Sequence, residues 1–371
     1  MRKSFQYKAK LSPSAERNAF AWLNLCRQLY NTALEQRIDA YKRLGKGISR
    51  YTQDKELPNL KIELPEYKNI DAQTLQDVLE KLDKTYQSFF RRLKQGKKAG
   101  FPRFKGRDRY NSFKLKQTSW SLTGNKLAIR NIGTLKLFLS RPILGDIKTV
   151  TVKYTSNGWF VSFSCDNVPR NVLPPTDKEI GIDVGLKVFL ADSDGNFVEN
   201  PRFFRKSEKE LRRKQRSLSR KKLRSKRRQK AKRQVQRVHE KVKNQRADFV
   251  RKLAKEYVDS NGVIYVEALK IVNMVKNKYL SKSIGDASWN MFRQWLAFKA
   301  EEAGREVIAI NPKNTSQTCL CGEIIKKSLA ARVHRCNVCG LVMDRDTLAA
   351  KNILRFGQNR QVSTRPIGLV A

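Results

Sequence analysis

The amino-terminal half of the chain combines one strand-like pattern with two long helical patterns. Residues 3–9 alternate apolar and polar side chains in the manner of a β-strand. Ser12 and Pro13 supply a helix cap and a first helical residue, so a helix is predicted from about Pro13 until the pattern fades near Gly45. A second helix is predicted over residues 71–96. Together they predict a small helical bundle.

From residue 100 onward the pattern changes to short alternating runs, separated by turn signals at Gly124-Asn125 and Asn157-Gly158. This texture predicts an antiparallel barrel or sandwich. We expect the strand at residues 3–9 to join it, which makes the helical bundle an insertion within a β domain. A linker near Pro174-Pro175 leads to a further region, and 371 residues are enough for two or three domains.

Strands and helices alternate in the carboxyl-terminal half. An apolar strand carries Asp183, two more strands follow at residues 187–191 and around 197, and the three predict a meander. After a long basic segment, the run GVIYVEALK predicts a buried strand that ends at Glu267. A helix near 288–303, a strand in REVIAIN and a last helix bearing Asp346 complete the pattern.

The charge of the chain changes this picture, because 78 Lys+Arg against 34 Asp+Glu give a net charge of +44. Such a field attracts polyanions, and nucleic acid is the expected partner. Between Arg202 and Lys255 there are 25 basic residues against four acids. A solvated face or a disordered tail would also explain this run, but apolar residues at helical spacings favour two ordered helices or one long bent helix. No run of about 18 apolar residues is present, so we expect a soluble, cytoplasmic protein without membrane contact.

Four of the six cysteines fall between residues 319 and 339. Cys336 and Cys339 have the two-residue gap with which neighbouring thiolates share one tetrahedral zinc, whereas Cys319 and Cys321 enclose a single residue. His334 is therefore an alternative ligand. Unligated cysteines in a core are a second interpretation, but clustering fits structural Zn²⁺ in a reducing compartment better.

Asp183, Glu267 and Asp346 all belong to predicted elements of one α/β region. A buried carboxylate needs a cationic neighbour, hydrogen bonds or a hard cation, so each could singly be an ion-paired strand end. The order of the elements is that of a ribonuclease H-like fold, in which such acids converge at one sheet edge. There they would hold two Mg²⁺ ions about 4 Å apart for phosphodiester hydrolysis.

The chain resembles the TnpB (OrfB) family of insertion-sequence-encoded, RNA-guided DNA nucleases, which are related to type V CRISPR effectors. The resemblance rests on the motifs GFPRFKGRDRYNSFKL, GIDVGLKVFLADSDG, VIYVEAL, NPKNTSQTC and CGLVMDRDTLAAKNI. It implies Asp183, Glu267 and Asp346 as catalytic metal ligands, with Asp346 rather than Asp344. It also implies a guide RNA, a double-stranded DNA target with a short flanking motif, and a monomer carrying one RNA.

The implied architecture is a multi-domain α/β protein with a RuvC nuclease domain, an inserted zinc knuckle and a preceding wedge β-barrel. The expected segments are 1–12 and 100–175 for the wedge, 13–99 for a helical recognition insertion, 176–312 and 343–371 for the RuvC domain, and 313–342 for the knuckle. Residues expected to contact nucleic acid in the amino-terminal half are Tyr30, Asn31, Gln73, Gln76, Asn111 and Ser112, each of which could instead be a cap, turn or surface residue.

Two departures from the family pattern bear on activity. Leu348 stands where the family has Asn, and the first cysteine pair is one residue short. A nuclease-dead RNA-guided repressor therefore remains an alternative, as does a transposase that acts without RNA. A basic structural protein of the ribosomal kind would explain the charge but not the three acids.

Overall fold

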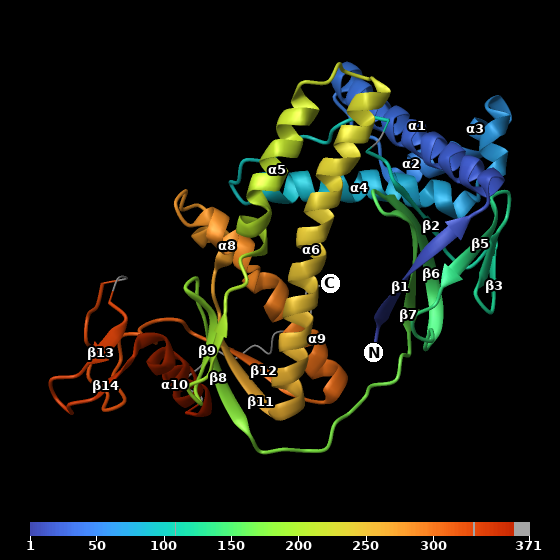
Figure 1. Cartoon of the computed structure of the whole chain (residues 1–371). Helices are drawn as coiled ribbons and strands as arrows, with labels where there is room; N and C mark the ends of the chain where they lie inside the picture. The colour runs from blue at the N-terminus through green and yellow to red at the C-terminus, as the bar shows by residue number, and fades with distance from the viewer. Residues whose placement is uncertain (108, 329–330, 360–371) are drawn as a thin grey trace. The chain divides into compact units, whose positions relative to one another are not determined.

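The first unit, Met1–Pro169, is built around a curled seven-stranded antiparallel sheet (Figure 1). The computed structural model describes residues 1–107, 109–328 and 331–359, so the predicted tail after residue 359 lies outside the described residues. The strands are β1 (Lys3–Leu11), β2 (Ser112–Leu115), β3 (Trp120–Thr123), β4 (Lys126–Ile129), β5 (Gly133–Phe138), β6 (Asp146–Thr155) and β7 (Gly158–Asp166). Their order is β2-β6-β7-β1-β5-β4-β3, so the described strands form an open series with β2 and β3 at its ends.

β1 joins this sheet, as predicted, and lies between β7 and β5. Phe5, Tyr7 and Ala9 are buried while the residues between them face outward, because side chains alternate along a strand. The β-rich region therefore begins with the first residues of the chain and resumes after the helices.

The helices of the first unit are α1 (Pro13–Leu44), α2 (Arg50–Lys55), α3 (Leu57–Glu63), the 3₁₀ turn η1 (Pro65–Asn69) and α4 (Ala72–Lys94). The Ser12 side chain accepts a hydrogen bond from Ala15 N–H at the start of α1, and Gly45 ends the helix in the left-handed region with φ 64°. α1 packs against α4, whose first turn is capped by Asp71. The predicted bundle and its helix ends are confirmed.

A five-stranded sheet organises the second unit, which begins at Arg170. Its order is β10-β9-β8-β11-β12. β8, β11 and β12 are parallel to one another, whereas β9 pairs antiparallel with both β8 and β10. The strands are β8 (Glu179–Val184), β9 (Val188–Asp192), β10 (Phe197–Glu199), β11 (Val263–Glu267) and β12 (Glu306–Ile310). The predicted meander and the two later strands are confirmed.

Helices cover both faces of the second sheet. One core joins the sheet to α6 and α9, and a smaller cluster joins it to α10. The helices are α5 (Phe203–Ser219), α6 (Lys226–Ser260), α7 (Ile271–Met274), α8 (Ser281–Ala287), α9 (Trp289–Ala303) and α10 (Arg345–Gln358), and β13 (Val333–Arg335) pairs with β14 (Val342–Asp344) as a small hairpin.

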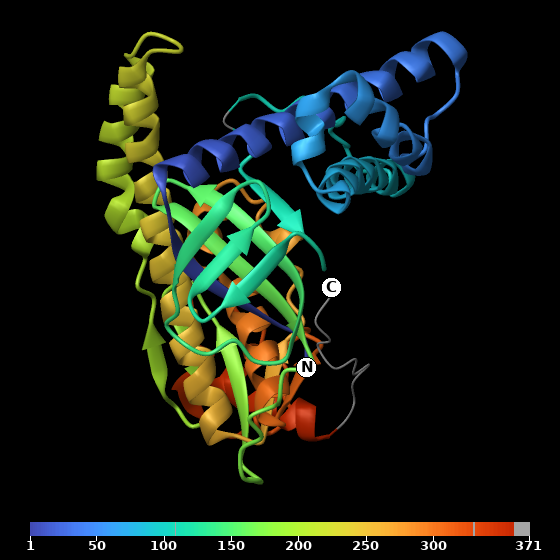
Figure 2. The same cartoon turned by 90° about the vertical axis from the view of Figure 1, so that its right-hand side faces the viewer.

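The basic segment forms two helices rather than a disordered tail. α5 and α6 run side by side as a hairpin (Figure 2). Leu211 on α5 and Val238 and Val242 on α6 are buried, so the apolar residues at helical spacing hold the pair while the cations face solvent. None of the helices among the described residues is long and apolar enough to cross a membrane.

Candidate active site and cysteine centre

Strand alternation decides which face of the second sheet each acid takes. Ile180 and Ile182 of β8 belong to the core with α6 and α9, so Gly181 and Asp183 point to the opposite face, where α10 packs. A β-carbon at Gly181 would lie 2.2 Å from the carbonyl oxygen of Ala350 in α10. Glycine at this position therefore lets α10 approach the strand that carries Asp183.

The same alternation places Glu267 on the α10 face. Val266 of β11 lies in the core with α6 and α9, whereas Tyr265 belongs to the cluster with α10. β11 runs parallel to β8 with Val266 beside Ile182, so the next residue on each strand is an acid. Because α10 begins at Arg345, its first turn brings Asp346 to the same edge of the sheet.

The charges of Glu267 and Asp346 both act on Asp183, which indicates that the three acids lie near one another. Asp183 keeps some accessible surface, yet the protein atoms around it are dense. This burial raises the pKa of Asp183 well above its usual range, the charges of Glu267 and Asp346 raise it further, and Arg345 lowers it. Burial also raises the pKa of Glu267, while a hydrogen bond from Thr315 opposes that rise. Three neighbouring carboxylates, of which Asp183 and Glu267 have raised pKa values, form a site that a hard cation would stabilise.

Asp344 and Asp346 have different tasks. The Asp344 carboxylate caps α10 by accepting hydrogen bonds from the backbone N–H groups of Asp346 (2.8 Å) and Thr347 (3.2 Å). Asp346 instead accepts from the Arg345 guanidinium at 3.1 Å and lies 3.4 Å from that of Arg332. The cap orients the first turn of α10, and the two arginines offset the charge of Asp346.

Thr315 is a residue of this site that the sequence did not reveal. Its hydroxyl donates to Glu267 Oε1 at 2.5 Å, and its backbone carbonyl accepts from the Asn352 side-chain amide at 2.8 Å. Asn352 also donates to the carbonyl of Thr318 at 2.6 Å. The segment after β12 is thereby tied to α10 and fixes one oxygen of Glu267. Thr315 belongs to the NPKNTSQTC motif, which marks the segment in the sequence, but no pattern links Thr315 to an acid 48 residues away.

Leu348 is fully buried, with an exposed fraction of 0%. It lies within α10 beside Ala349 and Ala350, which are also buried against the sheet. The hydrophobic side chain at this position is therefore fully enclosed by the protein, and the three acids of the site are all present.

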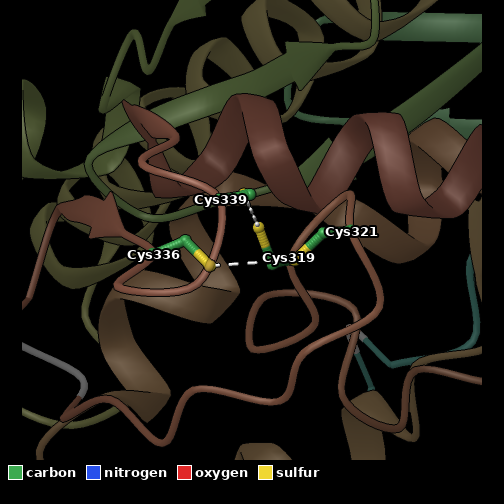
Figure 3. A group of neighbouring side chains, drawn as sticks. All are labelled: Cys319, Cys321, Cys336 and Cys339. Atoms are coloured by element: carbon green, nitrogen blue, oxygen red, sulfur yellow. Dashed lines mark hydrogen bonds between the residues drawn. The ribbon is translucent and has the colours of Figure 1, made fainter.

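The sulfur atoms of Cys319, Cys321, Cys336 and Cys339 all lie within 4.8 Å of one another (Figure 3). Cys319 Sγ is 3.6 Å from Cys339 Sγ, and Cys321 Sγ is 3.7 Å from Cys336 Sγ. Four sulfurs bound tetrahedrally at the usual Zn–S length of about 2.3 Å would be about 3.8 Å apart. The four side chains therefore fit zinc. Among the described residues the three carboxylates are not gathered this tightly.

The short first pair lies in a turn that directs both sulfurs to the same group. The backbone N–H of Gly322 donates to the carbonyl of Cys319 at 3.0 Å, and Gly322 has φ 101°, a conformation that favours glycine. Cys336 and Cys339 occupy the turn between β13 and β14, where the backbone N–H of Cys339 lowers the pKa of Cys336 to about 7. Cys336 is therefore the thiol of this turn that ionises more readily.

His334 lies outside the group of four sulfurs, although it was the alternative ligand. Its ring is fully buried, and Nδ1 contacts the ammonium of Lys327. Burial, followed by the Lys327 charge, lowers the pKa of His334. The histidine is thus a buried sequence neighbour of Cys336 and is not one of the four candidate zinc ligands.

Two residues that were expected to contact nucleic acid, Tyr30 and Asn31, instead make contacts within the first unit. Tyr30 is 2% exposed, with the ammonium of Lys105 over its ring at 5.2 Å. The amide of Asn31 donates to the Lys105 carbonyl at 3.0 Å and accepts from the Lys105 N–H at 2.7 Å. Both residues therefore fasten the segment after α4 onto α1. The other four expected residues are partly or fully exposed, and their contacts with nucleic acid stay predictions: Gln73, Gln76, Asn111 and Ser112.

Three family models match the chain. "Probable transposase" matches residues 162–278, "Cas12f1-like, TNB domain" matches 289–353, and "Helix-turn-helix domain" matches 1–46. In the structure residues 1–46 contain β1 and the single helix α1, so this part has no helix-turn-helix geometry. The second match spans the cysteine centre and Asp346.

The chain is also similar in fold to the mini-RNA-guided endonuclease CRISPR-Cas_phi3, with a TM-score of 0.50, 11% identity, and coverage of 96% of this chain and 92% of that one. It is 30% identical to a "Putative RNA-guided DNA endonuclease" of Streptomyces pristinaespiralis over 89% of this chain and 83% of that protein. The "Putative RNA-guided DNA endonuclease InsQ" of Escherichia coli K12 is 30% identical over 95% of this chain and 91% of its own length. On the strength of this full-length similarity and the matching transposase model, the chain belongs to the TnpB (OrfB) family.

Proposed function

We propose that the protein is an RNA-guided DNA endonuclease that cleaves double-stranded DNA beside a short flanking motif. The observation that carries this proposal is the meeting of Asp183, Glu267 and Asp346 on the α10 face of the second sheet. The names of its relatives and the net charge of +44 support nucleic acid as substrate and partner.

The residues of the site have distinct roles in this proposal. Asp183 is affected by the charges of both other acids and would be the shared ligand, Thr315 fixes one oxygen of Glu267, and the Asp344 cap orients Asp346. When bound, two Mg²⁺ ions would activate water and stabilise the leaving oxygen. The four cysteines would hold a structural Zn²⁺ that fixes the segment leading to Asp346.

We further propose that the second unit is a ribonuclease H-like RuvC domain interrupted by the knuckle at residues 313–342. Its sheet order, with an antiparallel meander followed by two parallel strands, supports this assignment. In the first unit, the sheet and its helical insertion at 13–99 would be the wedge and recognition parts. Base pairing with the guide would supply sequence specificity, while the protein reads backbone charge and shape.

The direct test is cleavage of a plasmid that carries a target matched to the RNA that copurifies with the protein. Cutting should require Mg²⁺ and the RNA, and Asp183→Ala should abolish it while DNA binding persists. Asp194→Ala is the matched control, because this exposed acid of the β9–β10 turn pairs with Lys178 away from the site. Binding without cutting by the unmodified protein would favour the repressor, and cutting without RNA would favour the transposase.

A further inference from the structure

Three exposed aromatic rings lie at the end of α4 and in the segment that follows it. Phe90, Phe101 and Phe104 are 53%, 49% and 52% exposed, although phenylalanine is normally buried. Phe89 joins two of them, with ring centroids 5.2 Å from Phe90 and 5.4 Å from Phe101. We call Phe90, Phe101 and Phe104 the aromatic platform.

The platform sits in a strongly basic setting. Residues 88–107 contain eight Lys or Arg and no acid, and almost all of these side chains are exposed. Arg91 and Arg92 follow Phe90 directly, and Arg103 stands between Phe101 and Phe104. Rings for stacking interleaved with cations for phosphates are the combination by which proteins bind unpaired nucleic acid.

The segment that carries Phe104 is held in place rather than left loose. Asn31 binds both backbone polar atoms of Lys105, and the Lys105 ammonium lies over the Tyr30 ring. Pro102, which lies between Phe101 and Phe104 in the sequence, is buried. A fixed support loses little conformational entropy on binding, which favours a preformed site over a fortuitous patch.

We infer that the aromatic platform stacks unpaired bases of the bound guide RNA, while the neighbouring arginines contact its phosphates. Rings interleaved with cations favour nucleic acid over a protein or lipid partner, because nucleic acid offers both bases for stacking and phosphates for the charges. RNA is favoured over DNA because exposed apolar patches need a lasting cover, and under the proposed function, on which this inference rests, the guide is the resident partner.

The test separates stacking from charge. Full-length protein freed of nucleic acid is titrated with a fluorescent single-stranded RNA of about twelve nucleotides at about 0.3 M salt, where weak phosphate contacts fade. The triple substitution F90L/F101L/F104L keeps apolar bulk but removes the π faces, and should weaken binding about tenfold or more without changing the salt dependence. The triple change to Tyr should restore affinity. Phe138→Leu, with matched 50% exposure on β5, is the control and should bind normally.

A second measurement locates the contact and tests the choice of RNA. An RNA containing 5-iodouridine should photocrosslink to the peptide spanning residues 88–107, and removal of Arg91 and Arg92 should lower the salt slope by about 0.7 per lost phosphate contact. Leu variants that bind like wild type, crosslinks elsewhere, or clearly tighter binding of the matching DNA strand would overturn the inference. Plasmid cleavage by the Leu variants is scored separately, so loss of the platform is not confused with failure of the nuclease proposal.

Discussion

Replacement of Asp183 by Asn should stabilise the protein in the absence of Mg²⁺ while abolishing cleavage. Asp183 is surrounded by protein and faces two further acids, so its ionised form is costly in the folded state. The amide of Asn has nearly the same shape and carries no charge. The site is therefore expected to trade stability for function.

The direction follows from the raised pKa, and the magnitude is taken from the usual range for single substitutions, about 0.5–3 kcal/mol. Each pKa unit corresponds to about 1.4 kcal/mol, and the pKa of Asp183 is raised well above its usual range by burial, Glu267 and Asp346. Because the folded pKa is higher than the unfolded one, the folded state binds the proton more tightly, and stability is lost as pH rises from about 4 through the raised pKa. At pH 7.5 the Asn variant should be more stable by about 1–3 kcal/mol, which shifts Tm upward by several degrees for a unit of this size, at about 2–4 °C per kcal/mol.

Thermal unfolding from pH 5 to 8.5, with EDTA or with Mg²⁺, measures this effect. Mg²⁺ should stabilise wild type and have little effect on Asp183→Asn. Asp192→Asn on the neighbouring strand is a control of opposite sign, because the Asp192 carboxylate accepts from Asn196 N–H at 2.9 Å and Tyr257 O–H at 3.0 Å. It should lose about 1–2 kcal/mol. An Asp183→Asn protein less stable than wild type in EDTA at pH 7.5 would refute the reasoning.

Three further predictions test single residues of the acid site, the cysteine centre and the first unit. Thr315→Val should shift the acid limb of the cleavage pH profile to higher pH, because the lost hydrogen bond lets the pKa of Glu267 rise further. Thr315→Ser should restore the wild-type profile. Thr318→Val, which loses a contact within the same segment, should leave the acid limb in place. Cys336→Ser should reduce bound zinc below one per chain by elemental analysis and lower Tm, and normal folding without zinc would contradict a structural metal. Asn31→Ala should lower the free energy of unfolding, measured in urea, by about 1–2 kcal/mol. It should leave the flanking-motif preference unchanged, because the Asn31 amide bonds backbone atoms of Lys105.

Local pattern was enough to predict most elements of both units. Alternation located β1 and the strands that carry Asp183 and Glu267, and the Ser12 cap and Gly45 stop bounded α1. These features could be predicted because a strand or helix end depends on residues adjacent in sequence. The cysteine segment was also evident in advance, because thiolates that share a metal are recognisable by their spacing.

The sequence by itself therefore determined the elements, the charge, and which residues could supply metal ligands. The tertiary structure decided which side chains far apart in sequence meet. Thr315 donates a hydrogen bond to Glu267, His334 lies outside the group of four sulfurs, and Asn31 bonds the backbone of Lys105. The same nonlocal folding leaves the Phe101 ring at the surface. The physical reason is that periodicity fixes the face on which a side chain lies, but its partner is set by which other segment packs against that face.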